Sequence, residues 1–481
     1  MVISDPDTAV PEAVWEGLGR FSVLPAWLRD AVRSDLVADA LRALPDFAGG
    51  TVTAEEVRVR QPRLEGEHWS ARYQVTVREC GRAARRVTLV GDLYPPGVEP
   101  AEARSTGTFG AAGWSGWLPQ LGLSLRPEPT DVGLPALPVL TDPGRARAVL
   151  ETMIRAGAAS YRDFHLAGCT PHLLRQHPNS RATIAYDLHY PPAVGGDDWP
   201  ARVVAKTYAD DTGEQTDEAM RVLWAARKSD WPLAVAEPLG YQRELHLLIQ
   251  GWVRSEQTFA DLLRDAVATG NPQAMRRVLD AAELAAAALA ALHTSDVDHG
   301  PHIGVHDELA GLGDLADHLM GMVVGLAGAA APLLGWLSAL AERDHSDAAV
   351  ATHRSFHPGQ ALLAGGHVGV IDFDDLCRAE PALDVAQFLA TTKYLAVSAT
   401  RTGGNPPPGV DLTRLVAADR VCTRFLRVYQ ALAPISPARV ALWESMHLFT
   451  YVLHSWTSIR PHRLTSAIAL LSRQLHTLES R

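Results

Sequence analysis

The residues best suited to chemistry in this chain lie between His353 and Asp372. The loop His353-Arg-Ser-Phe-His-Pro-Gly-Gln360 precedes the apolar run Val368-Gly-Val-Ile, which ends at Asp372. This pattern predicts a loop, a turn and a buried strand that ends by projecting a carboxylate. Such a carboxylate must be paired or metal-bound to offset its desolvation. A Mg²⁺ ion held against a nucleotide triphosphate suits the pattern, and the simpler alternative is that Asp372 caps a turn.

The elements that must position these residues predict an α+β fold. Period-two alternation of apolar residues is typical of strands and dominates the middle of the chain up to about residue 250, whereas helical periodicity follows. We expect residues 1–150 to form an N-terminal α+β unit, 151–253 a β-rich lobe, and 254–481 a helical lobe that carries the loop and strand described above.

The N-terminal unit shows a weak likeness to the β-rich lobe. The stretch that ends in Asp92-Leu-Tyr94 can be aligned with the one that ends in Lys206-Thr-Tyr208. Short β-meanders also resemble one another by chance. The alignment therefore suggests, as one of two alternatives, that residues 1–150 are a degenerate repeat of the lobe that follows.

The composition indicates a folded protein that does not bind nucleic acid. The chain has 481 residues, of which 47% are hydrophobic, and a formal net charge of −11. Neither a phosphate backbone nor an anionic lipid surface is attracted to a protein of this charge. The first ten residues hold two aspartates and no basic stretch, and the four cysteines are widely spaced, so we expect a cytoplasmic protein without a disulfide framework or zinc cluster.

The uncharged segment Leu319 to Ala341 is long enough to cross a bilayer. It is rich in Gly and Ala, and Pro332 interrupts it. We therefore expect a pair of buried helices and no stable membrane insertion. A weak amphipathic membrane contact is the alternative.

Several motifs together resemble the aminoglycoside phosphotransferase and choline kinase family, a branch of the protein-kinase-like fold. The resemblance covers about residues 150 to 470 and depends on Lys206 in a strand, Glu218 in the next helix, the loop from His353 to Gln360, Ile371-Asp372-Phe-Asp374, and Glu380-Pro-Ala-Leu-Asp384. It implies a two-lobed fold that binds ATP or GTP with Mg²⁺.

The resemblance also implies roles for single residues. Lys206 would bind the α and β phosphates and pair with Glu218, while Gln250 and Trp252 would lie in the connector whose backbone reads the base. Asp372 and Gln360 would hold the metal, with glutamine where most members of the family have asparagine. Asp384 would support the loop. Arg181 lies where a phosphate-covering hairpin is expected, although a solvated arginine is the simpler interpretation.

Ser355 departs from the family pattern, because the family has its proton-accepting aspartate at this position. A hydroxyl cannot accept a proton at neutral pH as a carboxylate does. Asp374, Asp375 or His357 could take that role, whereas both His353 and His357 are better interpreted as hydrogen-bonded scaffold residues.

Two functions follow from this departure. The first is a phosphotransferase acting on a hydroxyl of a small molecule or of a peptide Ser or Thr, with natural-product or modified-peptide biosynthesis as one setting. The second is a pseudokinase that binds nucleotide without turnover and contacts a protein partner through residues 1–150.

Overall fold

The computed structural model describes residues 9–50, 52–99, 109, 114–128, 134–177, 180–191, 199–398 and 411–479. The chain divides into two compact units, and each unit combines segments that are far apart in the sequence. Unit 1 contains Met1–Thr130, Glu308–Leu340 and Ser445–Arg481, and unit 2 contains Asp131–Asp307 and Ala341–Glu444. Both units combine a sheet with helices, which confirms the α+β prediction.

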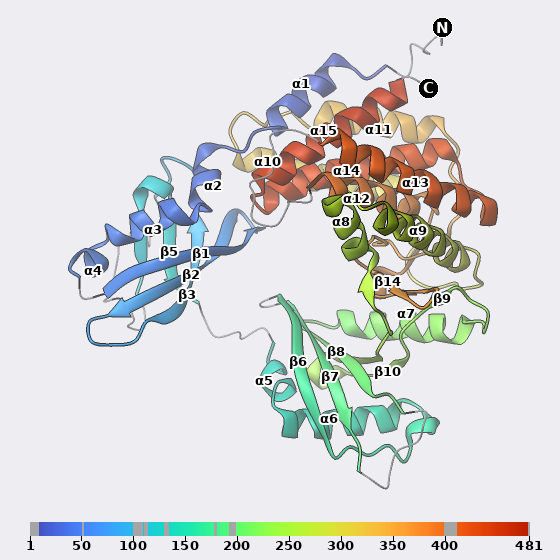
Figure 1. Cartoon of the computed structure of the whole chain (residues 1–481). Helices are drawn as coiled ribbons and strands as arrows, with labels where there is room; N and C mark the ends of the chain where they lie inside the picture. The colour runs from blue at the N-terminus through green and yellow to red at the C-terminus, as the bar shows by residue number, and fades with distance from the viewer. Residues whose placement is uncertain are drawn as a thin grey trace. The chain divides into compact units, whose positions relative to one another are not determined.

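Unit 1 contains a five-stranded antiparallel sheet and helices from both ends of the chain (Figure 1). Its elements are α1 (Glu12–Phe21), α2 (Ala26–Ala31), α3 (Ser34–Arg42), α4 (Pro45–Ala48), β1 (Val52–Glu65), β2 (His68–Glu79), β3 (Arg85–Leu93), β4 (Gly116–Leu118), the 3₁₀ turn η2 (Pro119–Leu121), β5 (Leu123–Pro127), the greater part of α10 (Val305–Met322), α11 (Ala331–Arg343) and α14 (Pro437–Thr457), and α15 (Pro461–Glu479).

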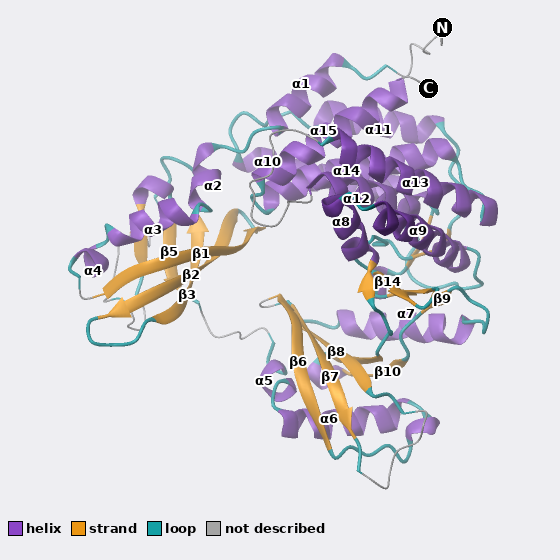
Figure 2. Cartoon of the chain, viewed as in Figure 1, coloured by secondary structure: helices purple, strands orange, loops and turns teal. Residues whose placement is uncertain are grey.

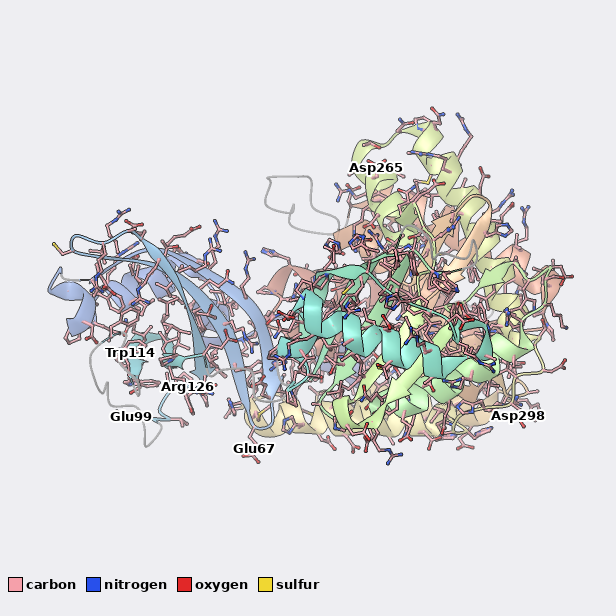
Figure 3. The ribbon with its side chains drawn as sticks, turned by 90° about the horizontal axis from the view of Figure 1, so that it is seen from below. Glu67, Glu99, Trp114, Arg126, Asp265 and Asp298 are labelled. Atoms are coloured by element: carbon pink, nitrogen blue, oxygen red, sulfur yellow. The ribbon has the colours of Figure 1, made fainter. Side chains whose placement is uncertain are left out.

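Buried tryptophans join the N-terminal sheet of unit 1 to its C-terminal helices. Trp69 Nε1 donates a hydrogen bond to the carbonyl oxygen of Trp456 (3.0 Å), and Trp456 Nε1 donates to that of Phe21 (2.9 Å). Figure 3 shows the β1–β2 turn, labelled at Glu67, beside α10, where His318 Nε2 bonds Gly66 O at 2.6 Å. The described residues 308–340 and 445–479 therefore belong to unit 1 with the N-terminal sheet, and the residues from 254 onward do not form one continuous helical lobe.

Unit 2 contains the shorter parts of α10, α11 and α14, Arg439 included, and the remaining elements, many of which Figure 2 labels. They are α5 (Leu137–Leu140), α6 (Pro143–Gly157), η3 (Ala159–Tyr161), β6 (Gly168–His177), β7 (Arg181–His189), β8 (Arg202–Tyr208), α7 (Thr212–Ala226), β9 (Leu233–Ala234), β10 (Pro238–Gln242), η4 (Arg243–Leu245), β11 (Leu247–Gly251), β12 (Gln257–Thr258), α8 (Phe259–Thr269), α9 (Pro272–His293), β13 (Val350–Thr352), β14 (Ala361–Ala364), β15 (His367–Val370), η5 (Phe373–Asp375), β16 (Cys377–Ala379), α12 (Ala382–Ser398) and α13 (Leu412–Leu432).

The large sheets of the two units have the same topology. The strand order is β1-β2-β3-β5-β4 in unit 1 and β6-β7-β8-β11-β10 in unit 2. In unit 1, Tyr94 N donates to Gly122 O at 2.8 Å, and in unit 2 Tyr208 N donates to His246 O at 3.0 Å. Gly122 and His246 both have left-handed backbone, with φ of 57° and 43°. Tyr94 and Tyr208 therefore occupy equivalent places, as the sequence alignment of the two stretches places them.

This equivalence puts Asp92 of unit 1 at the place that Lys206 has in unit 2. Asp92 lies opposite Ser124 on β5, and Lys206 lies opposite Leu248 on β11. Asp92 pairs with Arg126 at 2.5 Å. A carboxylate at this place would repel a phosphate, so the sheet of unit 1 lacks the charge that its counterpart offers.

The uncharged segment near residue 330 forms parts of two helices, as predicted, but these are only partly buried, since Ala331, Gly335 and Ala339 of α11 are exposed. Pro332 lies in the first turn of α11, where its missing N–H costs nothing. None of the helices in the described residues is long and apolar enough to span a bilayer.

Candidate active site

A tight hairpin in unit 2 brings Gln360 and Asp372 together. Strands β14 and β15 pair antiparallel through the turn Gly365-Gly366, whose φ angles are 50° and 88°. Glycine is favoured at both places because they need left-handed backbone. Past the end of the hairpin, Ile371 N donates to Gln360 O at 3.4 Å, and Gln360 Nε2 donates to Asp372 Oδ2 at 3.4 Å.

The oxygen atoms at this position suit a hard cation. Gln360 is 7% exposed, and its Oε1 is buried without a hydrogen-bond partner among the described residues. Carboxylate and amide oxygens are ligands of Mg²⁺, which usually keeps water and phosphate as its other ligands. In the described part of the chain no three His, Cys, Asp or Glu side chains cluster as a metal cage. An ion here would therefore take its remaining ligands from phosphate and water.

Lys206 lies between two carboxylates. Its Nζ is 2.6 Å from Asp372 Oδ1 and 2.8 Å from Asp374 Oδ1. Burial alone would lower the pKa of Lys206, but its neighbours Tyr208, Asp374 and Asp372 outweigh burial and raise this pKa above its usual value. Burial would likewise raise the pKa of Asp372, but the charge and hydrogen bond of Lys206 hold it below its usual range. Lys206 and Asp372 are therefore both charged at neutral pH.

Arg181 closes this group of charges from the β6–β7 hairpin. Arg181 lies opposite Tyr208 in the β7–β8 register, two residues from Lys206, and its guanidinium is 3.0 Å from Asp374 Oδ2. Asp374 thus has one oxygen on each cation. It is a partner of Lys206 and Arg181, and so it is poorly placed to be the free proton acceptor that sequence analysis considered.

The predicted partner of Lys206, Glu218, does not contact it. Glu218 is exposed on α7, and no ion pair between the two residues occurs in the described structure. The inward face of α7 carries Asp217, which pairs with Arg221 at 2.7 Å. Successive helical residues are about 100° apart, so the neighbour of an inward residue points away. The structure gives the role of ion-pair partner to Asp372 and Asp374 instead.

Asp384 holds the loop that contains Ser355. Its Oδ2 accepts from His353 N at 2.7 Å and lies 3.1 Å from His293 Nε2, and Asp384 is fully buried. His293 Nδ1 in turn lies 2.7 Å from the hydroxyl of Tyr429. Sequence analysis missed His293 and Tyr429. The only signal for His293 was a single histidine at the end of an Ala-rich helix, which is weak.

Ser355 and His353 form a hydrogen-bonded pair in this loop. His353 Nε2 is 3.0 Å from Ile371 O, and a carbonyl can only accept, so Nε2 carries the proton. His353 Nδ1 is then an acceptor, and Ser355 Oγ donates to it at 3.1 Å. Between them Arg354 has a φ of 65°, a left-handed conformation that is rare outside glycine and is often found at functional sites.

His357 is a neutral scaffold residue. Its Nδ1 accepts from Gly359 N at 3.0 Å. Burial, together with the nearby His353, lowers the pKa of His357 from 6.5 to about 4. Its only basic nitrogen is already used within the loop. His357 is therefore not available as a general base.

The low pKa of His357 predicts a loss of stability in acid. The unfolded chain takes up a proton near pH 6.5 and the folded chain only near pH 4, so the free energy of unfolding falls as the pH drops through this range. We expect a loss of about 3 kcal/mol by pH 4, since the shift from 6.5 to about 4 corresponds to about 3.5 kcal/mol in full, at about 1.4 kcal/mol for each pKa unit. Urea unfolding from pH 7.5 to 4 should show this slope reduced in His357→Asn and retained in the exposed control His367→Asn. An equal slope in both variants would contradict the assignment.

In the segment predicted to connect the lobes and contact a nucleotide, the side chains of Gln250 and Trp252 pack within the protein. Gln250 is buried in β11, opposite Val204 of β8. Trp252 stacks on Arg202, whose guanidinium carbon lies 4.8 Å from the ring centroid. If these residues contact a base, they would do so through their backbone groups. Their side chains therefore do not indicate whether the base is adenine or guanine.

Comparisons with known proteins match the chain to one family and to several solved structures. The sequence model of the phosphotransferase enzyme family matches residues 193–443. None of the curated proteins compared with the sequence matches it. Similar solved structures include a glucosamine kinase (16% identity, TM-score 0.47, covering 94% of this chain and 99% of that chain). Two others are an aminoglycoside phosphotransferase solved with ADP and hygromycin B (15%, 0.44, 67% and 98%) and a choline/ethanolamine kinase family protein from Mesorhizobium loti (12%, 0.45, 70% and 98%).

Proposed function

We propose that this chain, which belongs to the phosphotransferase enzyme family, transfers the γ-phosphoryl group of ATP to a hydroxyl of a small molecule. The observation that carries the proposal is the contact of Lys206 with Asp372, next to the amide oxygen of Gln360, which has no hydrogen-bond partner among the described residues. A fixed cation beside two hard oxygen ligands is what a metal-bound triphosphate requires.

Each residue has a separate task in this proposal. Asp372 and Gln360 hold Mg²⁺, which neutralises charge on the phosphate oxygens when bound. Lys206 binds phosphate oxygens, and Arg181 exchanges Asp374 for a phosphate when the nucleotide enters. Asp384 keeps the loop of Ser355 in place through His353 N. Because phosphoryl transfer depends mainly on position and charge, this set supports catalysis without a carboxylate at residue 355.

Several finer points belong to the proposal. The acceptor hydroxyl could instead belong to a peptide Ser or Thr in natural-product or modified-peptide biosynthesis, and GTP could replace ATP. A cytoplasmic location accords with four cysteines that are all free thiols.

The alternative function is that of a pseudokinase. Ser355 at the place of the catalytic aspartate favours it, as does the closed group of two cations and two carboxylates around Asp374. In this case the sheet of unit 1, with Asp92 in place of a lysine, would serve a protein partner.

Calorimetry and a substrate screen test the proposal. ATP and GTP should bind with Mg²⁺ and much more weakly without it. An unbiased screen of metabolites and peptides should then yield a phosphate ester. Metal-dependent binding with no product from any acceptor would favour the pseudokinase, and absence of binding would remove both. In Ser355→Asp, a sharp rise in turnover would identify a disabled kinase, whereas a fall would show that the serine works as it stands.

A further inference from the structure

Ser355 and His353 have the arrangement of a nucleophile and its base. The hydroxyl of Ser355 donates to His353 Nδ1, and the carbonyl of Ile371 orients the ring by accepting from Nε2. The ring also packs 4.6 Å from that of Phe373 and is fully buried. A hydroxyl, a basic nitrogen and a third group that orients the base together are the mark of an activated nucleophile.

The hydroxyl also lies close to the candidate metal site. Gln360 Nε2 is 3.4 Å from Ser355 Oγ and 3.4 Å from Asp372 Oδ2, so one amide nitrogen contacts both. Ser355 is partly exposed, whereas His353 is not. A phosphoryl group bound near Asp372 would therefore lie close to the hydroxyl of Ser355, which is accessible and hydrogen-bonded to a histidine.

Two of the alternative proton acceptors, Asp374 and His357, are already occupied, whereas Asp375 is exposed on η5. Asp374 has an oxygen on each of Lys206 and Arg181, and His357 Nδ1 is bonded to Gly359 N. Among the described residues, the hydrogen-bond partner of His353 Nδ1 is the hydroxyl of Ser355, which can itself react. This difference singles out the Ser355 and His353 pair.

We propose that Ser355 is itself a phosphoryl acceptor, so that the chain forms a phosphoserine at the catalytic position. The Ser355 Oγ to γ-phosphorus bond forms as the bond from the γ-phosphorus to the β,γ-bridging oxygen breaks. The electron pair of the broken bond leaves with ADP, and the hydroxyl proton passes to His353 Nδ1. The inference rests on the proposed nucleotide site. It also depends on the serine itself, because an aspartate at residue 355 has no hydroxyl to form a phosphoserine.

Intact-protein mass spectrometry after incubation with Mg²⁺ and ATP tests the inference. The expected result is a mass gain of one phosphoryl group, which peptide mapping places on Ser355. The gain should be absent in Ser355→Ala and present in Ser346→Ala, an exposed serine in the loop after α11. In His353→Gln the amide can still donate to Ile371 O but offers no base, so labelling should slow by about 10²-fold.

Thermal shift with Mg²⁺ and ATP on the same samples separates the possible failures. A rise in Tm with ATP and no mass gain would overturn the inference and leave the nucleotide site intact. A gain that maps to another residue, or that persists in Ser355→Ala, would overturn it as well. If ATP neither binds nor labels the wild-type chain, the proposed function fails, and this inference fails with it.

Discussion

Asp372→Asn should weaken Mg²⁺-dependent ATP binding by about 100-fold, which equals about 2.7 kcal/mol. Asp372 is the carboxylate that we place on the metal, and the amide offers an oxygen without the negative charge that binds a divalent ion. Lys206 keeps Asp374 at 2.8 Å, so the cation remains paired in the variant. Calorimetric titration of the wild type and of Asp372→Asn with ATP, with and without Mg²⁺, measures the loss of affinity. The affinity measured without Mg²⁺ should be the same in both proteins.

Asparagine is the appropriate replacement because of the backbone at this position. Asp372 has a φ of 75°, and asparagine adopts left-handed backbone more readily than alanine does. Asp265→Asn makes the same chemical change at an exposed residue of α8, labelled in Figure 3. It should bind ATP as the wild type does. Equal affinity in both variants would mean that Asp372 does not hold the metal.

The parts of this site that depend on local sequence could be predicted. The apolar run before Asp372 and the Gly365-Gly366 turn determine a hairpin whose register places Gln360 beside Asp372. The α+β fold and the family resemblance are confirmed for a similar reason, since they depend on strand periodicity and on contiguous motifs.

The parts that depend on tertiary packing could not be predicted. Whether Asp217 or Glu218 faces inward on α7 is decided by one residue of helical phase, which a weakly patterned helix does not reveal. The choice of Asp374 for Lys206 follows from the turn after the left-handed Asp372, and a single sequence gives no sign of that turn. His293 meets Asp384 across 91 residues of chain. Such contacts are set by which helices pack together.

The division into units has the same origin. Helical periodicity predicts helices after residue 253 without saying which sheet they cover. Trp69 and Trp456 become neighbours only because hydrophobic burial groups the last helices with the first sheet. The sequence therefore predicts the kinds of elements along the chain. It does not predict that the last helices belong to the same unit as the N-terminal sheet.

The last of these long-range contacts gives the largest expected effect on stability. Arg439 of α14 is fully buried, and its guanidinium is bidentate on Glu380, with Nε 2.7 Å from Oε2. Its NH1 also donates to Ala341 O at 3.1 Å. Removing one partner leaves a buried charge uncompensated, which costs about 3–5 kcal/mol. Arg439→Met should therefore lower Tm by about 6–20 °C, taking about 2–4 °C for each kcal/mol in a domain of this size.

The double variant Arg439→Met with Glu380→Gln decides whether the charge is responsible. Because it removes both charges, it should recover much of the lost stability, since a buried pair replaced as a whole is often close to neutral. Arg264→Met breaks a pair with Asp261 in which both side chains are about half exposed, and it should leave Tm unchanged. Calorimetric unfolding of the wild type, Arg439→Met, Glu380→Gln and the double variant gives the coupling energy directly. If the double variant were as unstable as Arg439→Met, the stabilisation would come from the carbonyl contacts of Arg439 and from its packing, and not from its charge pairing with Glu380.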